Sequence, residues 1–147
     1  FLNQYGYHRY EISNYSLDGH ECKHNKGYWT RKEYLGLGLG ASSLIQNQRW
    51  KQTESMEEYL AYAHRDIQVL SVQEQMEEFV FLGLRLMEGI SYQDFEQTFH
   101  LDFRSVYGKV LEKHSNDHFL LEENGRLRLT QKGIDMSNYI LADFLLD

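Results

Sequence analysis

Residues 71–89 carry the sequence SVQEQMEEFVFLGLRLMEG, which begins with a helix start signal and ends in glycine. Ser71 and Glu74 have the spacing of a capping box, in which each side chain accepts a hydrogen bond from the other residue's backbone N–H. Gly89 can adopt the left-handed conformation that commonly follows a helix. The stretch therefore predicts one long helix whose apolar side is formed by Met76, Phe79, Val80, Gly83, Leu86 and Met87.

Two shorter helices are expected after this stretch. Ser91, followed by Asp94, predicts the start of a helix over residues 92–100. The next helix is expected over about residues 102–114, and its buried side would be formed by Val106, Val110 and Leu111.

A hairpin and a last helix complete the C-terminal half. Asn124-Gly125 is a strong turn signal and predicts a hairpin between strands at residues 119–122 and 126–129. Thr130 predicts the start of a helix with Ile134, Leu141, Phe144 and Leu145 on one face. Three helices followed by a hairpin are typical of a winged helix-turn-helix module, here with an added C-terminal helix.

The N-terminal half is less regular. Residues 7–15 alternate in character and predict a strand, whose sheet partners we expect to lie outside this sequence, because an isolated strand cannot satisfy its backbone groups. Ser55 predicts the N-cap of a helix over residues 56–66.

Between residues 35 and 45, large side chains alternate with Gly36, Gly38 and Gly40. A glycine-rich loop cradles phosphate when it lies between a strand and a helix, but no helical pattern follows here. The alternation therefore favours a strand that another backbone approaches closely.

Composition places the chain among globular proteins. Of its 147 residues, 41% are hydrophobic and 25% are charged. The longest apolar stretch, residues 79–87, contains Arg85 and is far shorter than the roughly 20 residues that cross a bilayer. A single cysteine, Cys22, and the absence of a signal peptide favour a cytoplasmic setting. Because the first residue is Phe1, we expect a fragment or a processed product.

Charge is unevenly distributed along the chain. Residues 1–53 hold seven lysines and arginines against four acids, whereas the whole chain has 15 against 22. The acidic surplus therefore lies in the C-terminal half. This balance disfavours binding to nucleic acid, which needs clustered basic residues.

Nucleic-acid binding is one hypothesis for the winged module, through the helix at residues 102–114. Its basic side chains would be Arg104, Lys109, Lys113, Arg126 and Arg128, and they are opposed by Asp102, Glu112, Glu122 and Glu123. The opposing acids favour a module that packs against another domain or a partner.

Two further hypotheses concern residues 20–29. His20, Cys22 and His24 would face one way on an extended segment, which suits Zn or Cu, although only three ligands are evident. Alternatively, His24 could ligate a heme iron, and Tyr28 and Trp29 could stack on the porphyrin. Heme propionates would then pair with nearby cations, which are Lys23, Lys26, Arg31 and Lys32.

Several elements together resemble one known family. They are YEISNY at residues 10–15, ECKHN at 21–25, YW at 28–29 and EYLGLG at 33–38, followed by EQMEE at 74–78 and LTQKG at 129–133. In this combination the chain resembles the radical SAM proteins related to oxygen-independent coproporphyrinogen III oxidase. Its His-Asn-x-x-Tyr-Trp element resembles their heme chaperone branch, HemW.

The resemblance implies an α+β fold. Residues 1–53 would be the end of a radical SAM partial (β/α) barrel, that is, its last strand and the following segment. Residues 54–70 would form a connecting helix, and residues 71–147 a winged-helix-like HemN C-terminal module. A [4Fe-4S] cluster and S-adenosylmethionine are implied for the full-length protein, but the three cluster cysteines are not in this chain.

The resemblance also implies a heme-handling element at His24, Asn25, Tyr28 and Trp29. His24 would be the axial ligand, Tyr28 and Trp29 ring contacts, and Asn25 would orient the loop. Relatives often carry Gly-x-Gly-Pro-Gly-Ala-His-Ser where residues 36–43 here lack the proline and the histidine. Any role of that loop's imidazole therefore cannot be carried over.

The implied function is binding of heme and its delivery to acceptor proteins. The alternative is oxidative decarboxylation of coproporphyrinogen III, for which this chain alone would be inactive. Expected partners are heme or porphyrin, heme-acceptor proteins and the missing N-terminal radical SAM domain, with peripheral but not transmembrane contact to a membrane and no nucleic acid.

Overall fold

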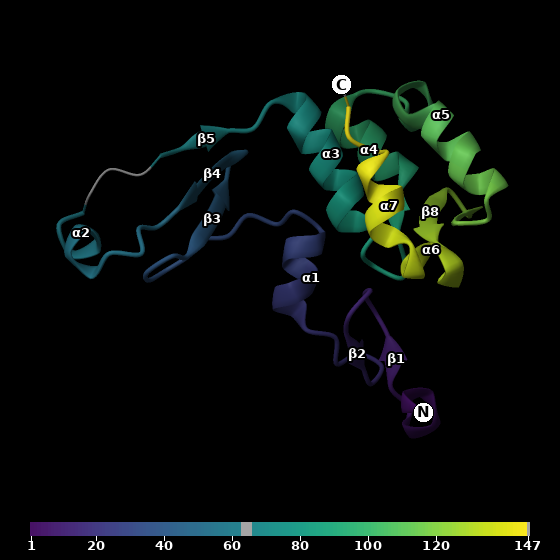
Figure 1. Ribbon diagram of the computed structural model, residues 1–147, viewed down its shortest axis with the longest axis horizontal. Coiled ribbons are helices and arrows are strands. Elements are labelled where there is room, and N and C mark those ends of the chain that lie inside the picture. The colour runs from purple at the N-terminus through teal and green to yellow at the C-terminus, as the bar shows by residue number, and fades with distance from the viewer. Residues whose placement is uncertain (63–65, 147) are drawn as a thin grey trace. The chain divides into compact units, whose positions relative to one another are not determined.

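The computed structural model describes residues 1–62 and 66–146, which form two compact units (Figure 1). One unit combines residues 1–31 with the described residues from Met76 onward, and the other holds residues 32–75. Both helices and strands are present, in agreement with the expected α+β class. The first unit is discontinuous in sequence, because the N-terminal segment packs with the C-terminal helices.

Helix α3 (Val72–Gly83) begins at the predicted capping box. Ser71 Oγ accepts the Glu74 N–H at 3.2 Å, and the Glu74 carboxylate accepts the Ser71 N–H at 2.7 Å. The prediction that this helix continues to Gly89 is wrong, because the backbone of residues 85–87 pairs with residues 10–12 instead. The Ile12 N–H donates to the Arg85 carbonyl, and the Met87 N–H donates to the Tyr10 carbonyl.

The remainder of the C-terminal part follows the predicted order. It consists of β6 (Ile90–Ser91), α4 (Tyr92–Phe99), α5 (Phe103–Asn116), β7 (Leu120–Glu123) and β8 (Arg126–Leu129). The two helices and the hairpin are confirmed, and β6 was not predicted because it has only two residues. The strands form an antiparallel sheet in the order β6-β8-β7.

The core of the first unit is built around aromatic rings. Phe103 lies with its ring centroid 4.9 Å from that of Phe95 and 5.0 Å from that of Tyr107, and all three are buried. Leu111 is buried as expected, whereas Val106 and Val110 are only partly buried. Helix α5 is therefore turned so that its aromatic residues, rather than its valines, point to the centre.

The predicted last helix is two helices, α6 (Gln131–Asp135) and α7 (Ser137–Ala142). The cap at Thr130 is confirmed, since its Oγ1 accepts the Gly133 N–H at 3.0 Å. The helix breaks at Met136, whose backbone leaves the helical region. After the break Leu141 and Phe144 are buried as expected, but Leu145 is 61% exposed, so its placement on the buried face was wrong.

The predicted strand over residues 7–15 is a hairpin. After the short 3-10 helix η1 (Leu2–Tyr5), β1 (His8–Arg9) pairs antiparallel with β2 (Tyr15–Ser16). The chain reverses because the Glu11 carboxylate accepts the Ser13 N–H at 2.8 Å and the Asn14 side-chain amide at 2.6 Å. The single-strand prediction is therefore wrong, and a pairing partner lies within this sequence.

The second unit is a small sheet with one short helix. Strands β3 (Ser42–Ile45), β4 (Gln48–Lys51) and β5 (Gln68–Val69) are neighbours in that order, and all pairs are antiparallel. Helix α2 (Met56–Leu60) is capped by Ser55, as predicted. The predicted continuation to Asp66 is wrong where it can be examined, because Asp66 is not helical, and residues 63–65 lie outside the described residues.

The glycine alternation precedes a strand and is not part of it, because β3 starts only at Ser42. A side chain at Gly36 would overlap the carbonyl oxygen of Ser42, so the expected close backbone approach is present there. Gly38 has a φ of 95°, which side-chain-bearing residues rarely adopt. The next described element after the run is the strand β3 and not a helix.

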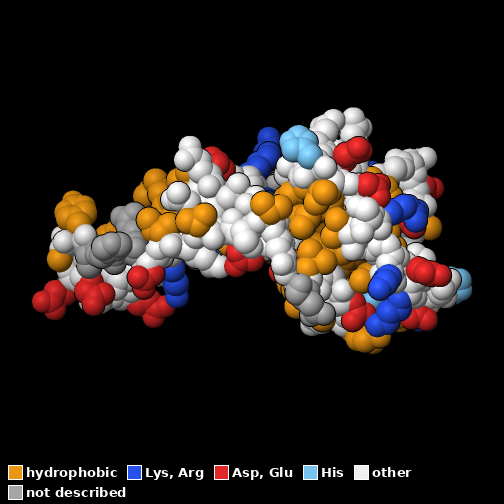
Figure 2. Space-filling model, turned by 90° about the horizontal axis from the view of Figure 1, so that it is seen from above, with side chains coloured by type: hydrophobic (Ala, Val, Ile, Leu, Met, Phe, Trp, Pro, Cys, Tyr) orange, Lys and Arg blue, Asp and Glu red, His pale blue; other side chains and the backbone are white. Residues whose placement is uncertain are grey.

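Large apolar side chains remain exposed in both units, and Figure 2 shows hydrophobic groups interspersed with acidic ones on one face. In the second unit Leu37 and Tyr62 are the most exposed, at 81% and 90%. Among the described residues no helix is long and apolar enough to cross a membrane.

Candidate functional site

The predicted site residues lie on helix α1 (Lys23–Trp29), in the first unit. The sequence patterns did not predict this helix, because it has seven residues, contains Gly27 and has no side-chain cap at its N-cap residue, Cys22. The signal that could have revealed it is the spacing of four between His24 and Tyr28, and between Asn25 and Trp29.

His24 and Tyr28 form one edge of α1. Their ring centroids are 4.7 Å apart with the planes at 75°, an edge-to-face arrangement. His24 is exposed and Tyr28 is half-buried. Within the described chain, no hydrogen bond or ion pair engages the imidazole of His24. The imidazole therefore stands at the surface beside an aromatic ring.

Trp29 lies on a different side of the helix. The guanidinium of Arg85 lies over its indole, 4.3 Å from the ring centroid, which is cation–π geometry. Trp29 Nε1 is buried and has no hydrogen-bond partner within the described residues. Asn25, four residues earlier, is half-buried. The structure therefore brings His24 and Tyr28 together but directs Trp29 toward the C-terminal part.

Arg85 also contacts a buried carboxylate. Its Nη2 lies 3.4 Å from Oε2 of Glu11, which is completely buried. The other oxygen of Glu11 holds the hairpin turn through Ser13 and Asn14. Glu11, Arg85 and Trp29 thus form a cluster that joins the N-terminal hairpin, α1 and the C-terminal part.

The four predicted propionate partners differ in availability. Arg31 forms an ion pair with Glu78 at 3.2 Å, and both side chains are mostly buried. Lys26 lies 3.9 Å from Glu88, and both of these side chains are partly exposed. Lys23 is exposed at the start of α1, whereas Lys32 belongs to the second unit. Lys23 and Lys26 are the cations on α1 that a bound anion could reach.

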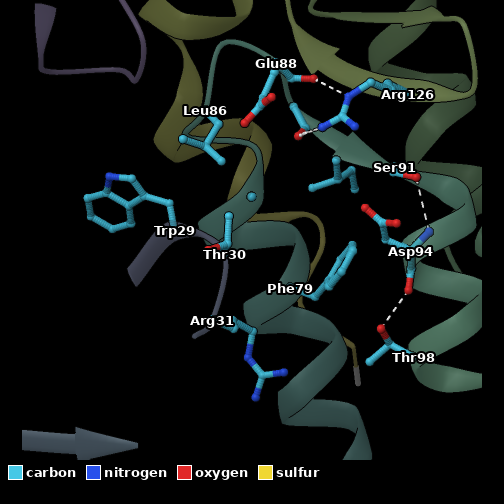
Figure 3. A pocket seen from close by; sticks show the side chains of 13 residues that line it. Trp29, Thr30, Arg31, Phe79, Leu86, Glu88, Ser91, Asp94, Thr98 and Arg126 are labelled. Carbon is cyan, nitrogen blue, oxygen red and sulfur yellow. Dashed lines mark hydrogen bonds between the residues drawn. The ribbon is translucent and has the colours of Figure 1, made fainter. Parts of the chain in front are cut away.

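A cavity of about 270 Å³ lies next to the C-terminal end of α1 (Figure 3). Trp29, Thr30 and Arg31 line one side, and Phe79, Leu86, Ile90 and other residues of the C-terminal part line the rest. Arg126 donates to the backbone carbonyls of Glu88 and Gly89, both at 2.9 Å. The cavity was not predicted, because its walls come from segments that are distant in sequence.

The alternative metal site is not formed. Cys22 is the N-cap of α1 and His24 is already helical, so the extended segment that would align His20, Cys22 and His24 does not exist. In residues 1–62 and 66–146, no group of three His, Cys, Asp or Glu side chains is arranged to hold a metal ion.

Most basic side chains of the C-terminal part already contact acids. Arg104 pairs with Glu122, Lys113 with Asp143 at 2.5 Å, and Arg128 with Glu123 at 3.4 Å. These pairs withdraw cations that a phosphate backbone would need.

Comparisons with known proteins cover the whole chain. Residues 70–136 match the HemN C-terminal domain family. The heme chaperone HemW of Lactococcus lactis is 37% identical over 99% of this chain, and that of Bacillus subtilis is 29% identical over 98%. The chain spans about 40% of the length of both. Among solved structures, coproporphyrinogen III oxidase (HemN) from Escherichia coli, described as a radical SAM enzyme, matches 99% of this chain and 38% of its own, with a TM-score of 0.74 at 18% identity.

Proposed function

We propose that this chain is part of a HemW-like heme chaperone, in the radical SAM family related to oxygen-independent coproporphyrinogen III oxidase, and that it binds heme for delivery to acceptor proteins. The relatives named heme chaperone cover nearly all of this chain. In this proposal heme is cargo, and the acceptor is another protein.

The observation that carries the proposal is the exposed His24 imidazole beside the Tyr28 ring. A neutral imidazole nitrogen is a common axial ligand of heme iron. A porphyrin face needs apolar, preferably aromatic contacts. Tyr28 would supply such a contact, since its ring centroid lies 4.7 Å from that of His24. Because no other described group engages the imidazole, ligation would break no existing hydrogen bond.

The other proposed heme-binding residues have different roles. Asn25 would orient the first turn of α1, and Trp29 would contribute the ring face that Arg85 does not cover. Lys23 and Lys26 would pair with the propionates, since Arg31 is occupied by Glu78.

The [4Fe-4S] cluster and S-adenosylmethionine are expected of the complete protein, as in other members of this family. The residues of this chain do not fit the cluster, which needs three cysteine ligands, because Cys22 is its single cysteine. No step in this proposal therefore passes through the cluster. The single exposed thiol suits the cytoplasm, the compartment that we propose.

Titration of hemin into the complete protein tests the proposal. We expect a shift of the Soret band that saturates, and in His24→Ala a shift that is weaker and lies at another wavelength. His20→Ala is the matched control, because His20 is also exposed and lies just before α1. Identical spectra for the wild type and His24→Ala would remove His24 as the ligand. Absence of any hemin binding would overturn the proposed function.

Oxidative decarboxylation of coproporphyrinogen III is the second candidate, because the fold is shared with HemN. Anaerobic product analysis of the complete protein decides it, since the reaction must yield protoporphyrinogen. Formation of that product would favour the oxidase. Hemin binding without product would favour the chaperone.

We further propose a winged-helix role for the C-terminal module and domain limits at residues 1–53, 54–70 and 71–147. Helices α3, α4 and α5 followed by the β7–β8 hairpin support a winged-helix order, with β6 as its third strand. The internal ion pairs of Arg104, Lys113 and Arg128 favour protein packing over nucleic-acid binding. A mobility-shift assay at low salt would show no retardation.

A further inference from the structure

We infer that Arg85 is a positioning residue for the heme site, acting on α1 through Trp29. This inference rests on the proposed function. The sequence elements at residues 21–25 and 28–29 predict site residues on α1 but say nothing of Arg85, which the structure places over the Trp29 ring. Arg85 itself does not contact heme in this proposal.

Helix α1 cannot hold its own conformation. Isolated helices shorter than about 12–15 residues are marginal in water, and α1 has seven residues, a central glycine and no side-chain cap. Its position therefore depends on contacts with the C-terminal part. These contacts include the Arg85–Trp29 stack, the Lys26–Glu88 pair and, just after the helix, the Arg31–Glu78 pair.

The stack is the contact that fixes the direction of the helix. Trp29 projects from the last turn, next to Tyr28 and four residues after Asn25. The Lys26–Glu88 pair is long and partly exposed, so it constrains α1 weakly. With Trp29 fixed, the orientation of the edge that carries His24 and Tyr28 is fixed as well.

Arg85 is fixed in turn by the fully buried carboxylate of Glu11. Arg85 Nε is buried without a hydrogen-bond partner among the described residues, so the indole face and the carboxylate determine where the guanidinium lies. Lysine lacks the planar group that stacks on a ring, and it would restore the charge but not the geometry. The backbone of Arg85 also pairs with Ile12, which fixes the segment that carries the side chain.

The test compares Arg85→Gln and Arg85→Lys with the wild type in the complete protein. Two quantities are measured, the hemin affinity and the hydrogen exchange of amides 23–29 without hemin. We expect Arg85→Gln to speed the exchange and to weaken hemin binding about tenfold, which corresponds to roughly 1.4 kcal/mol of lost cation–π energy. The Soret position at saturation should not change, because His24 still ligates the iron. Arg85→Lys should restore part of the affinity.

Arg128→Gln is the matched control, because Arg128 also pairs with a glutamate but lies on β8, away from α1 in sequence. It should alter neither quantity. Removing Arg85 leaves Glu11 buried without its cation, which could unfold the protein. Glu11→Gln combined with Arg85→Gln removes both charges, and Trp29→Phe weakens the stack from the other side.

The outcomes separate the two proposals. A folded Arg85→Gln protein with wild-type exchange at residues 23–29 and wild-type hemin affinity overturns the positioning role. If Arg85→Gln does not fold, wild-type exchange and wild-type hemin affinity in both the double variant and Trp29→Phe overturn the positioning role. If the wild type fails to bind hemin, the proposed function is lost. The exchange rates then still show whether Arg85 holds α1.

Discussion

Nε2 of His114 lies 2.7 Å from Oδ2 of Asp143, and the completely buried imidazole has its ring centroid 5.9 Å from that of Phe119 and 5.7 Å from that of Tyr139. Lys113 reaches the same carboxylate oxygen at 2.5 Å. The contact joins α5 to the residue that follows α7. It holds the end of the chain against the core of the C-terminal part.

His114→Ala should destabilise the protein by about 2–4 kcal/mol, because it removes a buried ring and a hydrogen bond. The free energy of unfolding in urea measures this. His118→Ala is the control, since His118 is exposed, and it should change stability by no more than about 0.5 kcal/mol. Equal effects of the two substitutions would contradict the role assigned to His114.

Stability should fall in acid partly through Asp143. The hydrogen bond from Lys113, and secondarily that from His114, lowers the pKa of Asp143 below its ordinary 3.8. A carboxylate with a lowered pKa stabilises the fold above its unfolded pKa, and this contribution disappears as the pH falls through the folded value. In Asp143→Asn the unfolding free energy should therefore decline less steeply between about pH 4 and pH 2. Asp135→Asn, at an exposed site, should keep the wild-type slope.

Gly83→Ala should destabilise the first unit by about 1–3 kcal/mol, because the new methyl group would overlap Cγ2 of Ile90. Gly108 provides the matched case, since it lies inside α5 with open space around its Cα. Gly108→Ala should stabilise by up to about 1 kcal/mol through helix propensity. Thermal melts that shift in the same direction for both variants would refute this difference.

Lys23→Gln and Lys26→Gln should each weaken hemin binding by a factor of about two to five, the range expected for exposed ion pairs. The effect should shrink as the salt concentration rises. Hemin dimethyl ester has no free propionates, so its affinity should be the same for both variants and the wild type. Lys109→Gln on α5 is the control. An equal loss of affinity for the ester would show that the lysines affect heme binding through the structure of α1 and not by pairing with the propionates.

Local signals in the sequence predicted most of the C-terminal elements. The capping boxes and caps at Ser71, Ser91 and Thr130 depend on residues three apart, and the Asn124-Gly125 turn depends on two adjacent ones. Such signals fail where a distant segment competes for the backbone. Helix α3 stops before Gly89 because residues 10–12 pair with residues 85–87.

In the candidate site, too, local sequence signals and contacts between distant segments determine different features. The sequence motif predicted His24, Asn25, Tyr28 and Trp29 as site residues, but it did not predict the helix on which they lie. It also did not reveal that Trp29 contacts Arg85 or that Arg31 is occupied by Glu78. These contacts join residues that are far apart along the chain, and no local pattern records such a pair.

The sequence by itself determined the chemistry available around residues 20–29, which is the His24 imidazole near aromatic residues and lysines and the single thiol of Cys22, and it also determined the helix and turn signals that depend on neighbouring residues. Only the tertiary structure decided what surrounds each of these groups. The buried Glu11 carboxylate contacts Arg85, and the guanidinium of Arg85 lies over the Trp29 ring, whereas His24 is exposed. The cost of burying an unpaired charge is a property of the folded environment, and it depends on contacts that chain order does not specify.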